Sequence, residues 1–313
     1  MGIAALEDKV VQQAVGRVLN QIWEEDFLGF SYGFRPGRSQ HDALDALWVG
    51  IMRKKVNWII DLDIRSFFDK IQHEWLVKFV EHRVRDKRIV RLIQKWLKAG
   101  VLEGRVVTVS DRGTGQGSVI SPLLANIYLH YALDLWAARW RQRAATGDMI
   151  IVRYADDFIV GFEHDSDGRC FLEQMRERLG KFALSLHSEK TRLIEFGRFA
   201  AERRKRQGLG KPETFDFLGF TFACGKTRTG KFQIRRKTRG DRMRAKLKEI
   251  KQEMRLRMHQ PIPEQGKWLG RIVRGYFNYH AVPTNGRALD EFRHHVTDLW
   301  LRRRSVRRQR SVT

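Results

Sequence analysis

Hydrophobic residues recur along this chain at two different spacings, and each spacing predicts a different kind of element. Where they return every three or four positions, they predict amphipathic helices. These stretches are residues 6–23, 40–52, 75–80, 89–97, 123–136, 171–184, 243–258, 268–277 and 289–300. Short apolar runs and strict alternation predict strands, and a polar stretch predicts an exposed loop. The strands are expected within residues 58–63, 150–160 and 215–222, and the loop at 198–212.

The run at 150–160 has the form of a hairpin whose tip carries two adjacent carboxylates. Largely apolar, β-branched residues flank the turn Tyr154-Ala155-Asp156-Asp157. Two carboxylates at the tip of a buried hairpin are costly unless a cation compensates them, and a divalent metal is the simplest such cation. For Asp156 and Asp157 alone, a solvated acidic turn remains the alternative. A third carboxylate near them would favour the metal site.

The strand at 58–63 supplies that third carboxylate. Because side chains alternate across a strand, Asp61 and Asp63 point the same way. If this strand pairs beside the hairpin, Asp63 meets Asp156 and Asp157 at one site. Such a site would hold two Mg²⁺ ions roughly 3.5–4 Å apart for an in-line displacement at phosphorus. Carboxylates suit this chemistry because Mg²⁺ prefers hard oxygen ligands and keeps room for water and a triphosphate.

Charge points to the kind of partner. The chain has 313 residues, with 60 Lys and Arg against 36 Asp and Glu, and its net charge is +24. A surface this basic attracts polyanions, so nucleic acid is the expected partner. No apolar run approaches the roughly 20 residues of a membrane span, and we expect no membrane association. Basic residues become dense after Gly225, which predicts a domain boundary between residues 225 and 226.

The segment from Ser31 to Ser39 combines loop-forming residues with positive charge. Its glycines and proline predict a loop, and the loop carries Arg35 and Arg38. Arginines in such a loop can bind phosphates through bidentate contacts. A glycine-rich turn with solvated arginines explains the same pattern equally well, so the chemistry leaves both readings open.

Several of these segments together resemble a known family. Residues 63–69 (Asp-Ile-Arg-Ser-Phe-Phe-Asp), the pair Gln116-Gly117 and the Tyr154-to-Asp157 turn resemble the palm motifs of reverse transcriptases. The Ser31-to-Ser39 segment, Ser-Tyr-Gly-Phe-Arg-Pro-Gly-Arg-Ser, narrows the resemblance to the group II intron-encoded reverse transcriptase/maturase family. The match covers nearly the whole chain, with the motifs in the family's order.

The resemblance implies an α+β fold built like a right-hand polymerase, with partial fingers, an antiparallel-sheet palm and a three-helix thumb. We therefore expect fingers and palm over residues 1–225, with the fingers mainly at 1–55 and 72–105. Residues 226–313 would form the basic helical thumb, or maturase domain, with an Arg-rich tail. The family carries a basic block before the segment that starts at Leu6, so its absence here predicts incomplete fingertips.

The resemblance also implies roles for individual residues. Asp63, Asp156 and Asp157 would bind the metals and carry catalysis, together with Lys190 near the triphosphate, although an ordinary surface lysine fits position 190 as well. Further nucleotide contacts would come from Ile64, which is also a metal-binding position, and from Phe68, Gln116 and Arg35. Primer, template or RNA contacts are expected at Arg38, Gly117, Leu218, Gly219, Arg235, Arg236, Arg271 and Arg274.

An aromatic residue at position 68 has a specific consequence in this family. Its ring packs under the incoming sugar and excludes a 2′-hydroxyl, so Phe68 would favour dNTPs over NTPs. The function implied is an RNA-directed DNA polymerase of group II intron type. It would use two Mg²⁺ ions to add dNTPs to a DNA or RNA primer on an RNA template, and it would bind intron RNA as a maturase. We expect it in the bacterial cytoplasm, associated with nucleoprotein.

Two alternatives stay open. One is a non-catalytic maturase that only stabilises folded intron RNA. The incomplete fingertips and Gly115, which replaces the family's usual proline, favour it, while the set of three carboxylates opposes it. The other is an RNA-templated RNA polymerase, which would use the same metal chemistry.

Overall fold

The structure, a computed structural model, describes residues 5–99, 101–103, 106–108, 111–114 and 118–310. Contacts within the chain separate it into two units, Met1–Lys211 and Pro212–Thr313. A boundary between residues 225 and 226 would instead cut through the strand β8 (Phe220–Lys226), which pairs along its length with the strand after it. Strand pairing therefore places the division earlier than the change in composition does.

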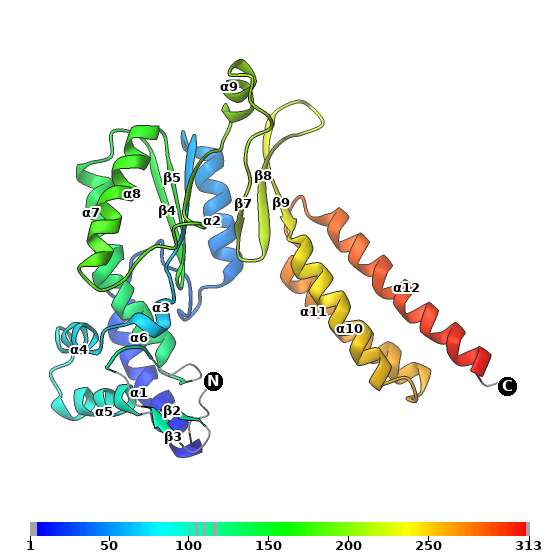
Figure 1. Cartoon of the computed structure of the whole chain (residues 1–313), viewed down its shortest axis with the longest axis horizontal. Coiled ribbons are helices and arrows are strands. Elements are labelled where there is room, and N and C mark those ends of the chain that lie inside the picture. The colour runs from blue at the N-terminus through cyan, green and yellow to red at the C-terminus, as the bar shows by residue number, and fades with distance from the viewer. Residues whose placement is uncertain (1–4, 100, 104–105, 109–110, 115–117, 311–313) are drawn as a thin grey trace. The chain divides into compact units, whose positions relative to one another are not determined.

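The first unit holds a four-stranded sheet in the order β4-β5-β1-β6, a two-stranded ribbon, and the helices around them (Figure 1). Every pairing in the four-stranded sheet is antiparallel, which confirms the sheet expected for a palm. The elements in chain order are α1 (Leu6–Glu24), α2 (Gln40–Arg53), β1 (Trp58–Asp63), α3 (Phe67–Lys70), α4 (His73–Glu81), α5 (Lys87–Lys98), β2 (Val101–Glu103), β3 (Val106–Thr108), α6 (Ser121–Leu129), the π-helical turn η1 (His130–Asp134), α7 (Leu135–Arg143), β4 (Met149–Tyr154), β5 (Asp157–Phe162), α8 (Asp165–Gly180), β6 (Arg192–Glu195) and α9 (Ala200–Arg206).

Helices cover both faces of this sheet, and small residues let one of them come close. On one face, Phe162 of β5 meets Phe171 of α8, with ring centroids 5.4 Å apart. On the other face, a Cβ added to Gly50 of α2 would lie 2.9 Å from the side chain of Ile150. A strand buried on both faces reads as a continuous apolar run. This burial explains why residues 150–160 lack the alternation of a half-exposed strand.

The stretch 198–212, predicted to be an exposed loop, contains the helix α9, so the loop prediction was wrong there. Ala200 is buried, and Arg203 forms an ion pair with Glu195 of β6. These contacts dock the helix beside the end of a sheet strand. Arginine and lysine are themselves good helix formers, so a polar composition alone does not indicate a loop.

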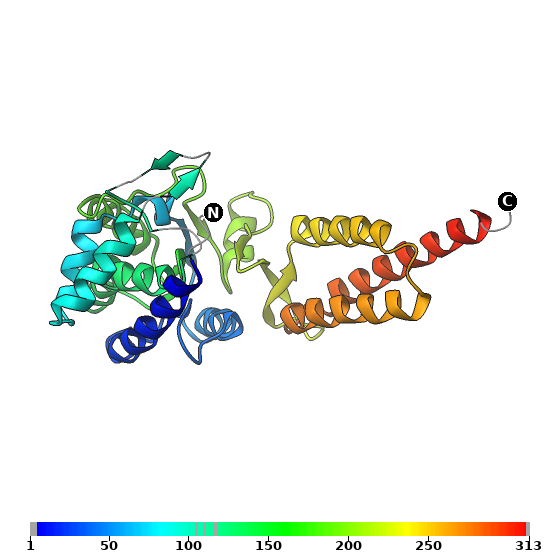
Figure 2. The ribbon, with the colours of Figure 1, turned by 90° about the horizontal axis from the view of Figure 1, so that it is seen from below.

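The second unit joins a three-stranded antiparallel sheet to three helices that lie alongside one another (Figure 2). Its elements are β7 (Phe215–Phe217), β8, β9 (Phe232–Thr238), α10 (Gly240–Leu256), α11 (Ile262–His280) and α12 (Gly286–Arg310). The three helices predicted from the apolar stripes are confirmed. They share one core, in which Tyr276 and Phe292 stack with ring centroids 3.6 Å apart. Across the described parts of both units, no helix is long and apolar enough to cross a membrane.

Candidate active site

The hairpin predicted from the apolar runs is present, and its tip is tight. β4 and β5 pair up to Tyr154 and Asp157, so Ala155 and Asp156 alone form the turn. Ala155 has a φ of 55°, in the left-handed region that residues other than glycine rarely adopt. The turn therefore needs support from its surroundings to keep this shape.

β1 pairs beside the hairpin, which was the condition for the expected site, and brings a third carboxylate to its tip. Asp63, the last residue of β1, lies opposite Asp157 of β5. Like charges directly opposite each other destabilise a sheet. Lys190 offsets this repulsion, because its Nζ lies 2.7 Å from Oδ2 of Asp63. This hydrogen bond and the charge of Asp63, with a smaller effect from Asp157, raise the pKa of Lys190.

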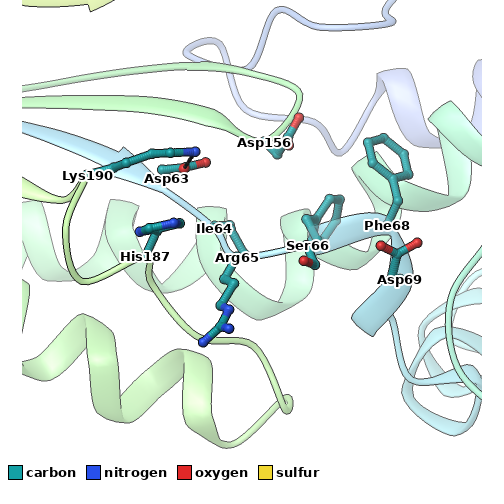
Figure 3. Close-up of a pocket in the computed structure, with 10 residues that line it drawn as sticks. Asp63, Ile64, Arg65, Ser66, Phe68, Asp69, Asp156, His187 and Lys190 are labelled. Atoms are coloured by element: carbon teal, nitrogen blue, oxygen red, sulfur yellow. Dashed lines mark ion pairs between the residues drawn. The ribbon is translucent and has the colours of Figure 1, made fainter.

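A pocket of about 430 Å³ opens beside these groups (Figure 3). Figure 3 shows the paired Asp63 and Lys190 toward one end, Asp156 on the hairpin tip, and Phe68 with Asp69 toward the other end. The residues that line it are Asp63, Ile64, Arg65, Ser66, Phe67, Phe68, Asp69, Asp156, His187 and Lys190. The predicted site residues Asp63, Ile64, Phe68, Asp156 and Lys190 thus share one pocket, whereas Asp157 is exposed and does not line it.

The electrostatics of Asp156 favour a cation in this pocket. Burial raises the pKa of the Asp156 carboxyl above its usual value, and the charge of Asp63 raises it further, against the opposing effects of a backbone hydrogen bond and Arg153. A divalent cation between the two carboxylates would relieve both costs. In the described part of the chain, no three Asp, Glu, His or Cys side chains are grouped to hold a metal by themselves. Two carboxylates beside an open pocket are compatible with a divalent cation such as Mg²⁺, which commonly takes one or two carboxylates and keeps water and substrate oxygens as its other ligands.

The nucleotide-contact residues predicted elsewhere in the first unit have different surroundings. Arg35 is buried and bound to the protein, so its place does not fit the predicted contact with a nucleotide. Its Nε and Nη2 bind the carboxylate of Glu24, and its Nη1 donates to the carbonyls of Leu28 and Ser31. Gly115, Gln116 and Gly117 lie outside the described residues.

Arg38 is half-buried rather than freely exposed. Its Nη1 donates to the Gly29 carbonyl at 2.7 Å, and its guanidinium lies 5.3 Å from the centroid of the Tyr32 ring. The Thr114 amide donates to the carbonyl of the pocket residue Phe68 at 2.9 Å. This bond fixes the backbone at Phe68, whose ring also packs edge-on against Phe67.

In the second unit, two adjacent arginines that were both predicted to contact RNA differ in exposure. Arg235 on β9 is exposed, whereas its neighbour Arg236 is buried at 2% exposure. The two residues differ because side chains of adjacent strand residues point to opposite faces. A guanidinium buried inside the unit does not fit the predicted RNA contact at Arg236. Arg271 and Arg274 are exposed on α11, as RNA contacts require.

The predicted primer-contact residues Leu218 and Gly219 form the turn between β7 and β8. Both have positive φ, 47° and 80°. The hydroxyl of Tyr279 donates to the Leu218 carbonyl at 2.9 Å and ties this turn to α11.

A buried ion pair next to the hairpin tip was not predicted from the sequence. Arg153 of β4 is fully buried and paired with Asp134 of η1, which is also fully buried. The signal was available, because an arginine inside an otherwise apolar strand needs a buried partner. The partner itself, 19 positions upstream, could not be identified from the pattern.

Comparisons with known proteins indicate the family of this chain. The family described as "Reverse transcriptase (RNA-dependent DNA polymerase)" matches residues 1–222. Protein YkfC from Escherichia coli strain K12 is 32% identical over 248 residues, which are 66% of this chain and 64% of YkfC. The group II intron-encoded protein LtrA from Lactococcus lactis subsp. cremoris is 42% identical over 132 residues, which are 42% of this chain and 21% of LtrA. The match thus spans less than two thirds of either relative.

A solved structure shows the same fold at low sequence identity. The telomerase from Candida albicans, in complex with a TWJ fragment of telomeric RNA, superimposes with a TM-score of 0.51 and 14% identity. The superposition covers 93% of this chain and 48% of the telomerase chain. This likeness concerns the fold, which is the right-hand polymerase fold expected from the motifs. The family match over residues 1–222 shows that the chain belongs to the reverse transcriptase family, and the similarity to LtrA supports its group II intron-encoded reverse transcriptase/maturase branch.

Proposed function

We propose that this chain is an RNA-directed DNA polymerase that extends a primer 3′ end with dNTPs and binds intron RNA as a maturase. One observation carries the proposal. Asp63 and Asp156, which come from separate elements, border the same pocket as Phe68, with Lys190 beside them. Carboxylates, a cation and an aromatic ring around one space suit a nucleoside triphosphate and the metal that accompanies it.

Asp63 and Asp156, with the backbone of Ile64, would hold Mg²⁺ in this pocket. Two Mg²⁺ ions bound there would activate the primer 3′-hydroxyl and neutralise charge on the leaving pyrophosphate. Asp157 lies opposite Asp63 and adds negative charge at the same edge of the sheet. We assign it a supporting electrostatic role rather than a place in the pocket.

Lys190 and Phe68 would act on the nucleotide itself. As a lysine, the Lys190 side chain is a cation at neutral pH, and its hydrogen bond to Asp63 raises its pKa further. It can donate a hydrogen bond to the triphosphate, or a proton to the departing pyrophosphate. The Phe68 ring is half-buried and lines the pocket, a position that suits exclusion of a 2′-hydroxyl.

The nucleic acid would be held by exposed positive charge and by the turn in the second unit. Arg235, Arg271 and Arg274 are exposed and can contact phosphates, which would make binding fall steeply with salt. The resemblance further assigns the primer end to Leu218 and Gly219, and template or nucleotide contacts to Gln116, Gly117 and Arg38.

Extension of a DNA primer on an RNA template tests the proposal. We expect Mg²⁺-dependent extension by the native chain and its loss in Asp156→Ala. A matched control is Asp148→Ala, because Asp148 lies at the opposite end of the same hairpin and binds Lys54 and the Lys55 amide instead of lining the pocket. This control should keep full extension.

Other outcomes would redirect the assignment. If the native chain and Asp156→Ala both fail to extend but bind structured RNA with equal affinity, the chain is a non-catalytic maturase. If the native chain incorporates NTPs in preference to dNTPs, the RNA polymerase alternative replaces the proposal.

A further inference from the structure

Arg153 forms an unusually complete set of contacts directly behind the Asp156 turn. It has no exposed surface, and all five of its N–H donors bind protein atoms. The Nε and one Nη2 hydrogen grip Asp134 as a fork. The other three donors reach, at 2.6 to 3.0 Å, the Ser31 hydroxyl, the Asn126 side-chain oxygen and the Ala155 carbonyl.

Stability alone does not account for such an ion pair. Taking two charges out of water is unfavourable, and a hydrophobic pair of the same size often stabilises a protein equally well or better. What a hydrophobic pair cannot do is bind a carbonyl oxygen at a fixed point. The contact with Ala155 is such a bond, and it lands on the residue that precedes Asp156.

The same network also encloses the turn from the side of the Ser31-to-Ser39 loop. The Asn126 amide nitrogen donates to the Gly33 carbonyl at 2.6 Å. A Cβ on Gly33 would lie 2.2 Å from the backbone nitrogen of Ala155, so only glycine allows this approach. The loop and β4 also exchange backbone bonds, from the Tyr32 amide to the Arg153 carbonyl and from the Arg153 amide to the Phe30 carbonyl.

The network thus holds a strained part of the chain. The left-handed conformation is unfavourable for a residue such as Ala155, so the turn would relax if its contacts were removed. Asp134 closes the π-helical turn η1, a distortion that is frequent at functional sites. Three separate segments, namely the loop, the α6–η1 helix and the hairpin, therefore meet at the Arg153 guanidinium, which binds the Ala155 carbonyl beside Asp156.

From these contacts we infer that Arg153 is a positioning residue, which fixes Asp156 against Asp63 at the spacing needed to bind the metal. The inference rests on the proposed function for its catalytic consequence. Its structural content, that Arg153 sets the geometry of the turn, is independent of that function. The Ser31-to-Ser39 loop then also helps to hold this turn in place.

Arg153→Lys tests the inference, because lysine keeps the charge beside Asp134 but lacks the planar guanidinium that binds Asp134 as a fork and reaches the Ala155 carbonyl with its other nitrogen. The matched control is Glu24→Gln, which breaks the ion pair of Arg35 in the same loop without touching the turn. Three readouts are compared: Mn²⁺ affinity by electron paramagnetic resonance, the Mg²⁺ concentration that half-saturates primer extension, and hydrogen exchange of the backbone amides at 155–158.

In Arg153→Lys we expect the Kd for Mn²⁺ and the half-saturating Mg²⁺ concentration to rise about tenfold or more, as for loss of a hydrogen bond to a charged group. The backbone amides at 155–158 should also exchange faster. In Glu24→Gln the Kd for Mn²⁺ and the half-saturating Mg²⁺ concentration should stay within about twofold of the native values, even if thermal stability falls. A folded Arg153→Lys protein with native Mn²⁺ affinity and native exchange at the turn would overturn the inference.

Two further outcomes are separable. If Arg153→Lys does not fold, Ser31→Ala removes a single acceptor and should shift the same readouts in the same direction by a smaller factor; no shift overturns the inference. If the native chain neither extends a primer nor binds Mn²⁺, the proposed function fails. Hydrogen exchange at the turn then still decides whether Arg153 positions it.

Discussion

Replacing Tyr279 with Phe would remove one hydroxyl that holds the turn proposed to seat the primer. The hydroxyl donates to the Leu218 carbonyl at 2.9 Å. Phenylalanine keeps the stacking on Phe220, where the ring centroids are 5.9 Å apart and nearly parallel. The substitution therefore removes the hydrogen bond to a residue whose φ, 47°, lies in the left-handed region.

The size of the effect follows from that geometry. A neutral intramolecular hydrogen bond contributes about 0.5–1.5 kcal/mol. The left-handed backbone at Leu218 costs roughly 1–2 kcal/mol, so the hydroxyl offsets a comparable amount. We expect the free energy of unfolding to fall by about 1 kcal/mol. The bound geometry of the turn should become less populated by a factor of about 2 to 10, and the Kd for primer–template should rise by that factor.

Urea unfolding, fluorescence anisotropy with a labelled primer–template, and single-nucleotide addition would measure these effects. Because the pocket carboxylates belong to the other unit, the rate of addition at saturating primer–template and the Mg²⁺ requirement should not change. Asn278→Ala, an exposed neighbour on the same helix, is the control for a general disturbance of α11. A Tyr279→Phe protein that loses stability but binds primer–template with native affinity would refute the role of this turn.

Three other substitutions test separate parts of the structure. Phe68→Ala should lower the ratio of dNTP to NTP incorporation efficiency, and an unchanged ratio would remove Phe68 from sugar selection. Phe292→Ala should lower the free energy of unfolding by about 3–5 kcal/mol in urea, because this ring is fully buried and stacked on Tyr276; a loss under about 1 kcal/mol would contradict that packing. Asp156→Asn, measured by thermal unfolding in a metal chelator, should stabilise the protein at neutral pH. Its raised pKa means that ionisation of Asp156 disfavours the folded state, so the gain should fade as the pH falls through that pKa.

Local patterns predicted the part of the site that local chemistry controls. The hairpin and the strand at 58–63 were visible because buried strands need apolar runs, and polar residues inside or beside such runs stand out. Their pairing put Asp63 next to the hairpin tip, as expected. The helices of the second unit were visible for the same reason, since each has an apolar stripe on one face.

The contacts that set each arginine's role could not be predicted in this way. Arg35 pairs with Glu24, 11 residues earlier, and no spacing rule links a loop residue to the end of a helix at that distance. The burial of Arg236 could not be predicted from composition, because the dense basic residues after Gly225 do not show that this stretch contains a strand with alternating faces. Once β9 is recognised as a strand, period-two alternation assigns Arg235 to one face and Arg236 to the other.

Buried arginines also change what the net charge can be used to infer. The value of +24 supports a polyanionic partner, but it does not identify the residues that touch one. Arg35, Arg153 and Arg236 are all buried, and the first two form ion pairs inside the first unit. Only exposed cations can release counterions when phosphates bind, so the salt dependence of RNA binding should follow residues such as Arg235, Arg271 and Arg274. For the same reason, Arg271→Gln should reduce the slope of log Kd against log salt, whereas Arg236→Gln should act through the stability of the second unit.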